Sequence, residues 1–158
     1  MKIIEGDLLK LASDGIFDVI IHGCNCQCVM GAGIAKSIKA IFPEAYEADC
    51  RTIKGSRNKL GTYSCALIGK LTIVNAYTQF HWKGRGIKVD YEAIRAIFKS
   101  IKINFSGKKI GYPMVGAGLA GGDWNVIAAI IDEELVGEDH TLVKFEKTKK
   151  KQLIGYPS

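Results

Sequence analysis

Residues 18–35 read DVIIHGCNCQCVMGAGIA, and this stretch combines three signals that together indicate a fold class. Its first five residues, DVIIH, form a near-continuous apolar run, which is typical of a strand buried on both faces of a sheet. Gly31-Ala32-Gly33 follows, and the next residues up to Phe42 favour a helix. A strand, a glycine-rich turn and a helix in this order predict an α/β domain.

The cysteines at positions 24, 26 and 28, behind His22, allow more than one interpretation. If the strand continued, these four side chains would face one side of the sheet. Four ligands in a row on one strand cannot surround an ion tetrahedrally, so we expect no metal site. We interpret the cysteines as small packing residues. A nucleophilic thiol at Cys26 or Cys28 is the alternative, but no arginine follows either one at the five-residue spacing of cysteine phosphatases.

The alternation of strands and helices continues along the rest of the chain. Further strands are expected at residues 2–4, 62–67, 71–76, 109–115 and 141–145. Helices are expected at residues 33–42, 43–50, 91–105 and 123–136. Asp90 and Asp123 are the expected N-caps of the last two helices, and Gly69-Lys70 is the expected hairpin turn. This order predicts a three-layer α/β/α fold with a mixed central sheet.

Length and composition limit the class of protein. The 158 residues fit one domain, and 47% apolar with 24% charged residues is typical of a globular protein without a membrane span. Five cysteines, an odd number in varied contexts, favour reduced thiols and a cytoplasmic location, and MKIIEGDLLK does not fit a signal peptide. A net charge of +6 indicates an anionic partner, although part of it lies in a basic tail, residues 147–158, that we interpret as a solvated terminus.

A second glycine-rich stretch, GAGLAGG at residues 116–122, also lies between a predicted strand and a predicted helix. In an open α/β sheet, ligands bind beyond the carboxyl ends of the strands, and N–H groups at a helix start favour an anion. Two such loops at one end of a sheet suit a diphosphate held from both sides. Tight turns are the alternative, but they need fewer glycines, and neither loop matches a Walker motif or GxGxxG.

Three stretches resemble the macrodomain family, whose members bind ADP-ribose: GDLL at 6–9, DVIIHGCNCQCVMGAGIA at 18–35, and YPMVGAGLAGGDWNVI at 112–127. The resemblance runs from Ile3 to about Glu146 and predicts one domain over residues 1–146. HGCNC, MGAGIA and GAGLAGGDWN are most similar to the ADP-ribose 1″-phosphate phosphatases of yeast and bacteriophages. It implies a phosphatase that converts ADP-ribose 1″-phosphate to ADP-ribose and phosphate without a metal or organic cofactor. The expected partners are ADP-ribose and its 1″-phosphate, in the host cytoplasm if the source is a phage. Nucleic acid and membranes are not expected.

The resemblance also implies which residues hold the ligand. Asp7 would accept the adenine amino group with Leu8 beside it, Phe145 would lie against adenine, and Asn25 would meet the distal ribose. Alternatively, Asp7 caps a short helix and Phe145 belongs to the core. The diphosphate would lie between two sets of loop residues: Gly31, Ala32, Gly33 and Ile34, and Gly116, Ala117, Gly118 and Leu119.

Two titratable side chains are the candidate catalytic residues. Asp123 follows the second glycine stretch, and it is expected to activate or position water. His22, three residues before Asn25, is expected to protonate the leaving ribose oxygen or to stabilise the phosphoryl charge. The alternatives are that His22 is a satisfied strand histidine and that Asp123 is only a helix cap.

Three other functions stay open. One macrodomain branch removes ADP-ribose from protein or nucleic acid with a lysine and an aspartate. The matching positions here look like Gln79 and Ala120, which argues against this route. Lys83 and Asp123 are close enough in sequence to keep it open. A pure ADP-ribose reader needs the loops but neither acid nor base. A nucleic-acid-binding protein is supported only by the positive charge. Residues 81–86, HWKGRG, form a loop that either covers the ligand or is a surface turn.

Overall fold

The computed structural model describes residues 1–145, and residues 146–158, with the predicted basic tail, lie outside the described part. The strands are β1 (Lys2–Gly6), β2 (Val19–Asn25), β3 (Tyr63–Ile68), β4 (Leu71–Gln79), β5 (Ile110–Tyr112) and β6 (His140–Phe145). The helices are α1 (Leu8–Ser13), α2 (Gly33–Ile41), α3 (Pro43–Cys50), α4 (Tyr91–Phe105) and α5 (Trp124–Glu134), with a short 3-10 turn η1 (Arg57–Lys59).

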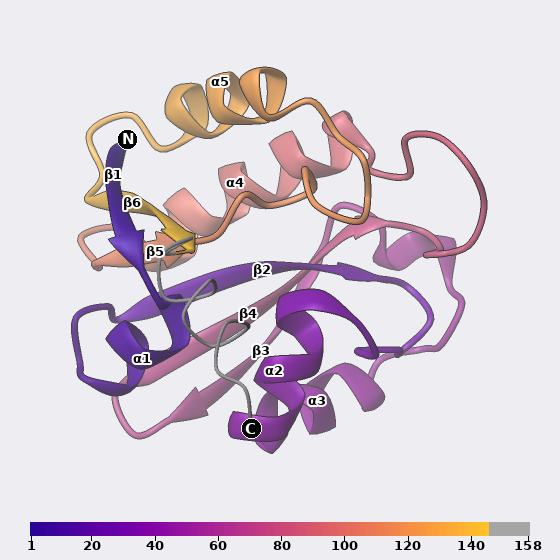
Figure 1. The fold of residues 1–158 in the computed structure, drawn as a ribbon, viewed down its shortest axis with the longest axis horizontal. Helices are drawn as coiled ribbons and strands as arrows, with labels where there is room; N and C mark the ends of the chain where they lie inside the picture. Colours follow the sequence, from indigo (N-terminus) through magenta and orange to yellow (C-terminus); the bar gives the residue numbers. More distant parts are fainter. Residues whose placement is uncertain (146–158) are drawn as a thin grey trace, which may run out of the picture.

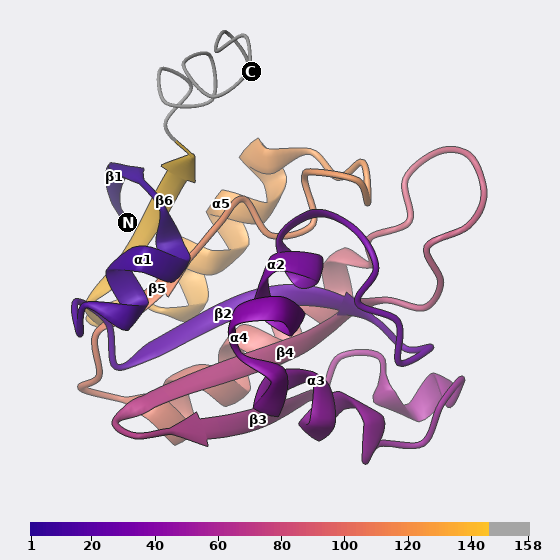
Figure 2. The same cartoon turned by 60° about the horizontal axis from the view of Figure 1, so that its bottom comes forward.

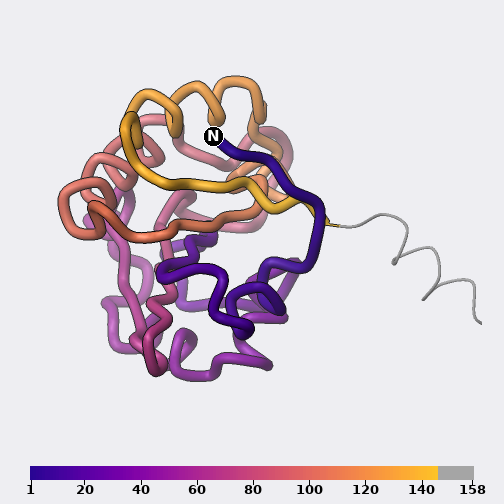
Figure 3. The backbone as a smooth tube through the Cα atoms, turned by 90° about the vertical axis from the view of Figure 1, so that its left-hand side faces the viewer, coloured from indigo at the N-terminus to yellow at the C-terminus, as the bar shows by residue number. Residues whose placement is uncertain are grey.

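The six strands form one mixed sheet in the order β1-β6-β5-β2-β4-β3. All neighbouring pairs are parallel except β3 and β4, which form the predicted hairpin. Helices α1, α2 and α3 cover one face, and α4 and α5 cover the other (Figures 1 and 2). The edge pair β1 and β6 lies side by side in Figure 3. The predicted three-layer α/β/α fold is confirmed.

The central strand β2 shows how the sequence builds two cores. Val19 and Ile21 pack in the cluster that contains the apolar faces of α4 and α5. Ile20, between them, packs in the cluster with α1, α2 and α3. Because successive side chains point to opposite faces, a strand covered on both sides must be apolar throughout.

Several element boundaries differ from the predicted ones. α1 was expected only as the alternative interpretation of Asp7, and η1 was not expected, since six and three residues are too few for a helical period to be read. β2 and β4 run further than predicted, to Asn25 and Gln79, because they pair with each other through polar residues. β5 ends at Tyr112 and not at residue 115, because the next residue, Pro113, has no N–H to donate to a neighbouring strand. Within residues 1–145, no helix is long and apolar enough to cross a membrane.

Candidate functional site

Two glycine-rich loops lie next to each other at one edge of the sheet. The first glycine loop, residues 26–32, follows β2, and the second glycine loop, residues 113–123, joins β5 to α5. β2 and β5 are parallel neighbours, so their carboxyl ends meet at this edge. A Cβ atom placed on Gly33 would lie 3.7 Å from Leu119 Cδ1, so the tip of the second loop lies close to the start of α2. The prediction that both loops share one end of the sheet is confirmed.

The first glycine loop leaves the start of α2 open to an anion. Ala32 is the N-cap, and its side chain offers no hydrogen-bond acceptor to the first turn. Gly33 begins the helix with φ of 58°, a left-handed conformation that favours glycine. Asn25 holds the base of the loop, since its Nδ2 donates to Val29 O at 2.8 Å and its Oδ1 accepts from Gln27 N at 2.9 Å. The amide of Asn25 is thus used to position this loop.

The glycines of the second glycine loop have different roles. Gly122 N donates to Gly116 O at 2.8 Å, which closes the loop on itself. A Cβ atom on Gly122 would lie 2.6 Å from that same oxygen, so only glycine fits. Gly118 is exposed, and a Cβ atom there would have no neighbour within 4 Å. Gly122 therefore fixes the loop, and Gly118 presents its backbone to solvent.

The predicted diphosphate residues are mostly accessible at this edge. Leu119 is 73% exposed at the tip of the second glycine loop. The other exposed members are Gly31, Ala32, Gly33 and Gly118, and the half-buried ones are Ile34, Gly116 and Ala117.

The predicted adenine residues lie at the ends of β1 and β6. Gly6, the last residue of β1, pairs with Phe145, the last residue of β6, so Asp7 comes directly after the residue that pairs with Phe145. Phe145 is 60% exposed, and its interpretation as a core residue is wrong. Asp7 Oδ1 accepts from Leu9 N at 3.0 Å, which confirms that it caps α1. Leu8 is buried in the core, and its side chain is turned away from solvent.

His22 lies in the middle of β2 and is only 1% exposed. Asn75 Nδ2 donates to Ala45 O at 2.9 Å, which leaves Asn75 Oδ1 to accept from His22 Nε2 at 2.7 Å. Burial lowers the pKa of His22 to about 4, so the ring is neutral near pH 7. These contacts fit the alternative of a satisfied strand histidine, and its catalytic role stays a prediction.

Asp123 is exposed where the second glycine loop enters α5. Its Oδ1 accepts from Asn125 N at 2.9 Å, which confirms the predicted N-cap of this helix. Its backbone N–H donates to Tyr91 Oη at 3.0 Å, which ties the loop end to α4. A carboxylate that is both capping and exposed can still act on water, so the catalytic role of Asp123 stays a prediction.

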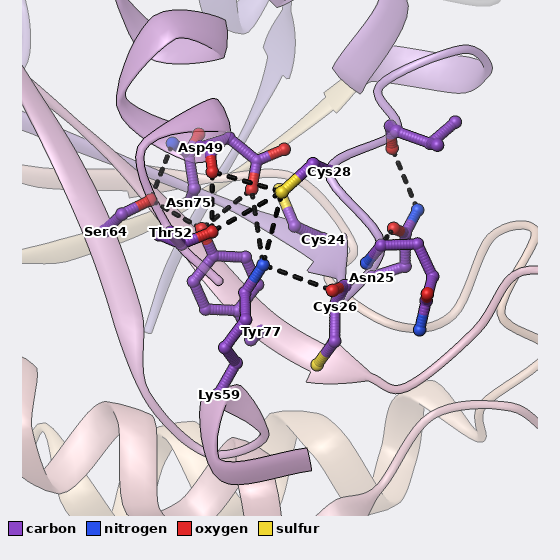
Figure 4. A network of polar contacts seen from close by, with 12 residues as sticks. Cys24, Asn25, Cys26, Cys28, Asp49, Thr52, Lys59, Ser64, Asn75 and Tyr77 are labelled. Carbon is purple, nitrogen blue, oxygen red and sulfur yellow. Dashed lines mark hydrogen bonds and ion pairs between the residues drawn. The ribbon is translucent and has the colours of Figure 1, made fainter. Parts of the chain in front are cut away.

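A buried polar network that the sequence did not reveal lies beneath the first glycine loop (Figure 4). Its centre is Lys59, which is buried and whose Nζ donates to Cys26 O at 3.2 Å. The same ammonium lies 3.5 Å from Cys28 Sγ and 4.0 Å from Asp49 Oδ1. Tyr77 donates its hydroxyl to Asp49 Oδ1 at 2.8 Å. One cation thus joins the loop backbone to α3 and β4.

Burial perturbs the acidic members of this network. Desolvation raises the pKa of Asp49, while the hydroxyl of Tyr77 and the charge of Lys59 oppose that rise. Desolvation also raises the pKa of Tyr77 and of the Cys24 thiol, so both stay protonated. Asp49 Oδ2 has no hydrogen-bond partner among the described residues. No sequence signal marks these residues, because a lone lysine and a lone helical aspartate read as surface residues.

Two comparisons identify the family. The family model described as Macro domain matches residues 21–131, which include most of β2, the first glycine loop and most of α5. A 17.5 kDa protein of Enterobacteria phage T4, described as uncharacterized, is 34% identical over 143 residues, or 84% of this chain and 88% of its own. The chain is a macrodomain.

Two further relatives of this macrodomain carry names of enzymes. The DNA ADP-ribosyl glycohydrolase of Mycobacterium tuberculosis is 30% identical over 126 residues, which cover 76% of this chain but only 34% of that protein. The ADP-ribose 1″-phosphate phosphatase of Aspergillus fumigatus is 45% identical over 56 residues, which cover 34% of this chain and 26% of that protein. The chain thus spans about a third or less of the enzymes with named activities.

Solved structures support the same fold. The macrodomain of Thermus aquaticus DarG has a TM-score of 0.69 and 24% identity over 90% of this chain and 96% of its own. Thermosipho africanus DarTG, solved in complex with ADP-ribose, has a TM-score of 0.71 and 18% identity over 94% of this chain and 42% of its own. At these identities the likeness establishes the macrodomain fold alone.

The cysteines of this macrodomain are free thiols. Cys24 and Cys26 are buried against Tyr77, as the packing interpretation predicted. Cys28 is half-buried beside Lys59, and no group of three His, Cys, Asp or Glu side chains within residues 1–145 is arranged to hold a metal ion.

Proposed function

We propose that this macrodomain binds ADP-ribose between its two glycine loops and hydrolyses ADP-ribose 1″-phosphate to ADP-ribose and phosphate. The observation that carries the ligand is the position of the Leu119 side chain next to Gly33, because it places the second glycine loop beside the start of α2. The open N-terminus of α2 adds N–H donors and a favourable dipole for the diphosphate.

The ends of β1 and β6 give the ligand a direction. Phe145 offers an exposed aromatic face to adenine, and Asp7 offers a carboxylate to its amino group. β5 and β6 are adjacent strands, so a ligand that starts at Phe145 passes next to the second glycine loop. The distal ribose would then lie near Asn25 and the first glycine loop. Its 1″ substituent would project toward the start of α5.

Asp123 is the residue we assign to the chemistry. Its exposed carboxylate positions a water molecule, which attacks phosphorus and passes a proton to the carboxylate or to solvent. The bond between phosphorus and the 1″ oxygen breaks, and this oxygen takes up a proton as it leaves. His22 was expected to supply that proton. Its buried, neutral ring instead supports a positioning role through Asn75, and solvent is the proton source we propose.

Removal of ADP-ribose from DNA is the second candidate. It is supported by the Mycobacterium tuberculosis relative, whose similarity extends over 76% of this chain, whereas the fungal phosphatase matches only 34%. It is opposed by Gln79 and Ala120 at the positions that the resemblance gives to the lysine and the aspartate of the covalent route. The ligand loops serve both reactions equally.

Phosphorus NMR tests the proposal directly. With catalytic protein and no added metal, ADP-ribose 1″-phosphate should give an inorganic phosphate line together with ADP-ribose. Asparagine caps a helix as well as aspartate, so Asp123→Asn should keep the fold and the binding of ADP-ribose but slow phosphate release by roughly 100-fold or more. Asp90→Asn, the same change at the N-cap of α4, is the matched control and should be active.

Other outcomes select between the alternatives. Broadening of the diphosphate lines by stoichiometric protein, without phosphate release, would identify a reader or an enzyme for another ADP-ribose derivative. Release of ADP-ribose from a modified DNA oligonucleotide would then establish the glycohydrolase. Full activity of Asp123→Asn would remove this residue from the mechanism. No effect on the ligand lines would refute ADP-ribose binding itself.

A further inference from the structure

Residues 80–88, FHWKGRGIK, form a surface loop between β4 and α4 that the proposed reaction does not use. We call it the aromatic-basic loop, because it holds two aromatic residues, one histidine and three cationic side chains but no carboxylate. Every residue from Trp82 to Ile87 is exposed. Figures 1 and 2 both show the loop projecting from the body of the protein beyond the end of β4.

The base of the aromatic-basic loop is fixed although its tip is exposed. Gln79 and Val89 form an antiparallel bridge that closes it. Phe80 O accepts from Cys26 N at 3.1 Å, and Lys88 N donates to Ala120 O at 2.8 Å. One end of the loop is therefore bound to the first glycine loop, and the other end to the second.

Two rings at the start of the loop form a stacking platform. His81 and Trp82 lie with centroids 4.1 Å apart and an interplanar angle of 22°. The backbone N–H of Lys83 donates to His81 Nδ1 at 3.0 Å, which fixes the histidine in place. Trp82 is 40% exposed, so part of the indole is open to solvent while the stack holds it. A simple surface turn does not require a tryptophan that is stacked on a neighbour and exposed.

Cationic side chains lie beside this platform and at the base and tip of the loop. Lys83 Nζ lies 5.7 Å from the centre of the Trp82 ring. Arg57 places its guanidinium 4.0 Å over the ring of Phe80 at the base of the loop. Arg85 lies exposed at the tip. Aromatic faces that alternate with cations bind single-stranded nucleic acids, because bases stack on the rings and phosphates meet the charges.

We propose that the aromatic-basic loop is a binding surface for single-stranded nucleic acid, with a base stacked on Trp82 and phosphates at Lys83 and Arg85. A duplex is disfavoured, because its bases already stack on each other and cannot cover the indole. An acidic peptide would satisfy the charges but not the stack. In the sequence, nucleic-acid binding was supported by positive charge alone and was not expected; the stack of His81 and Trp82 adds an aromatic surface to that charge.

This surface is separate from the proposed adenine position and does not rest on the proposed function. Phe145 lies on β6, and the loop follows β4, with β5 and β2 between these strands in the sheet. The base of the aromatic-basic loop is bound to both glycine loops, whereas Trp82 and Arg85 belong to neither of them.

Binding of a fluorescently labelled 12-nucleotide oligothymidylate to the full chain tests the proposal by anisotropy. Trp82→Ala should weaken binding by roughly tenfold or more, the loss expected for one stacked base. Lys83→Ala with Arg85→Ala should weaken it and reduce the slope of log K against log salt by about 1.4, at 0.7 per phosphate contact. The matched control is Lys99→Ala with Lys108→Ala, which removes two exposed charges elsewhere and should leave the slope nearly unchanged.

Four results would overturn the proposal. Equal binding of duplex and single strand, or unchanged binding by Trp82→Ala, would exclude the stacked base. If the control double variant weakened oligonucleotide binding as much as the loop double variant, the attraction would come from the overall charge and not from this loop. Full displacement of the oligonucleotide by excess ADP-ribose would place it in the glycine loops. An acidic peptide of equal charge that competes equally would assign the surface to a protein partner.

Discussion

Gly118 and Gly122 lie in the same loop, yet an added methyl group meets different surroundings at each. At Gly122 the Cβ atom would lie 2.6 Å from Gly116 O and 2.6 Å from Val89 Cγ1, and the first of these atoms belongs to the backbone and cannot rotate away. We expect Gly122→Ala to reduce the free energy of unfolding by about 2–3 kcal/mol, as overpacking does. For a domain of this size, the melting temperature should fall by roughly 5–10 °C.

Gly118 should behave in the opposite way. Nothing lies within 4 Å of its added Cβ atom, so Gly118→Ala should change the free energy of unfolding by less than about 0.5 kcal/mol. If the diphosphate lies against this exposed backbone, the methyl group separates them, and the Kd for ADP-ribose should rise by roughly tenfold or more. Thermal melting and calorimetric titration with ADP-ribose measure the two effects on the same samples.

Two results would contradict these expectations. Wild-type affinity in Gly118→Ala would mean that the second glycine loop does not approach the ligand, whatever the fold. A wild-type melting temperature in Gly122→Ala would mean that the closed shape of the loop does not depend on the close packing of Gly122 against Gly116 O.

Three further predictions follow from buried and exposed side chains. Lys59→Met leaves the buried carboxylate of Asp49 without its cation and should cost about 3–5 kcal/mol in urea unfolding; adding Asp49→Asn should recover most of that loss, and no recovery would contradict the ion pair. The free energy of unfolding should fall by about 3 kcal/mol between pH 6.5 and 4, because the unfolded chain binds a proton that buried His22 does not, and His22→Asn should remove this slope. Phe145→Ala should leave the melting temperature unchanged but weaken ADP-ribose binding, and unchanged calorimetric affinity would move adenine elsewhere.

The layered fold could be predicted because its signals are local. The apolar run of β2 and the glycines that follow it require a covered strand and a close turn, whatever the rest of the chain does. Asp90 and Asp123 both cap their helices as expected, since a carboxylate just before a helical period has a defined acceptor role. The sequence predicted that the two glycine loops lie at the same end of the sheet. It could not predict that the Leu119 side chain lies close to Gly33, because sequence gives the order of elements but not the distances between them.

The environments of the candidate catalytic residues could not be predicted. Whether His22 titrates near pH 7 depends on its burial and on its hydrogen bond to Asn75. These two residues are 53 positions apart in the sequence and meet only because their strands pair. The ion pair of Lys59 and Asp49 joins segments with no common pattern. Long-range polar contacts of this kind leave no period in the sequence.

The alternating cysteines illustrate how such contacts can imitate a metal motif. Cys24 and Cys26 pack against Tyr77, and Cys28 reaches the ammonium of Lys59, so all three contact the same buried network. Larger side chains would force the first glycine loop away from this network, whereas a thiol fills the space and accepts or donates a weak hydrogen bond. Cys28 also has φ of 57°, which a non-glycine residue adopts only when its surroundings hold it. The alternate spacing of the three cysteines therefore reflects their contacts with the buried network around Lys59 and Tyr77. These contacts also fix the backbone N–H groups of the first glycine loop, which we propose bind the diphosphate.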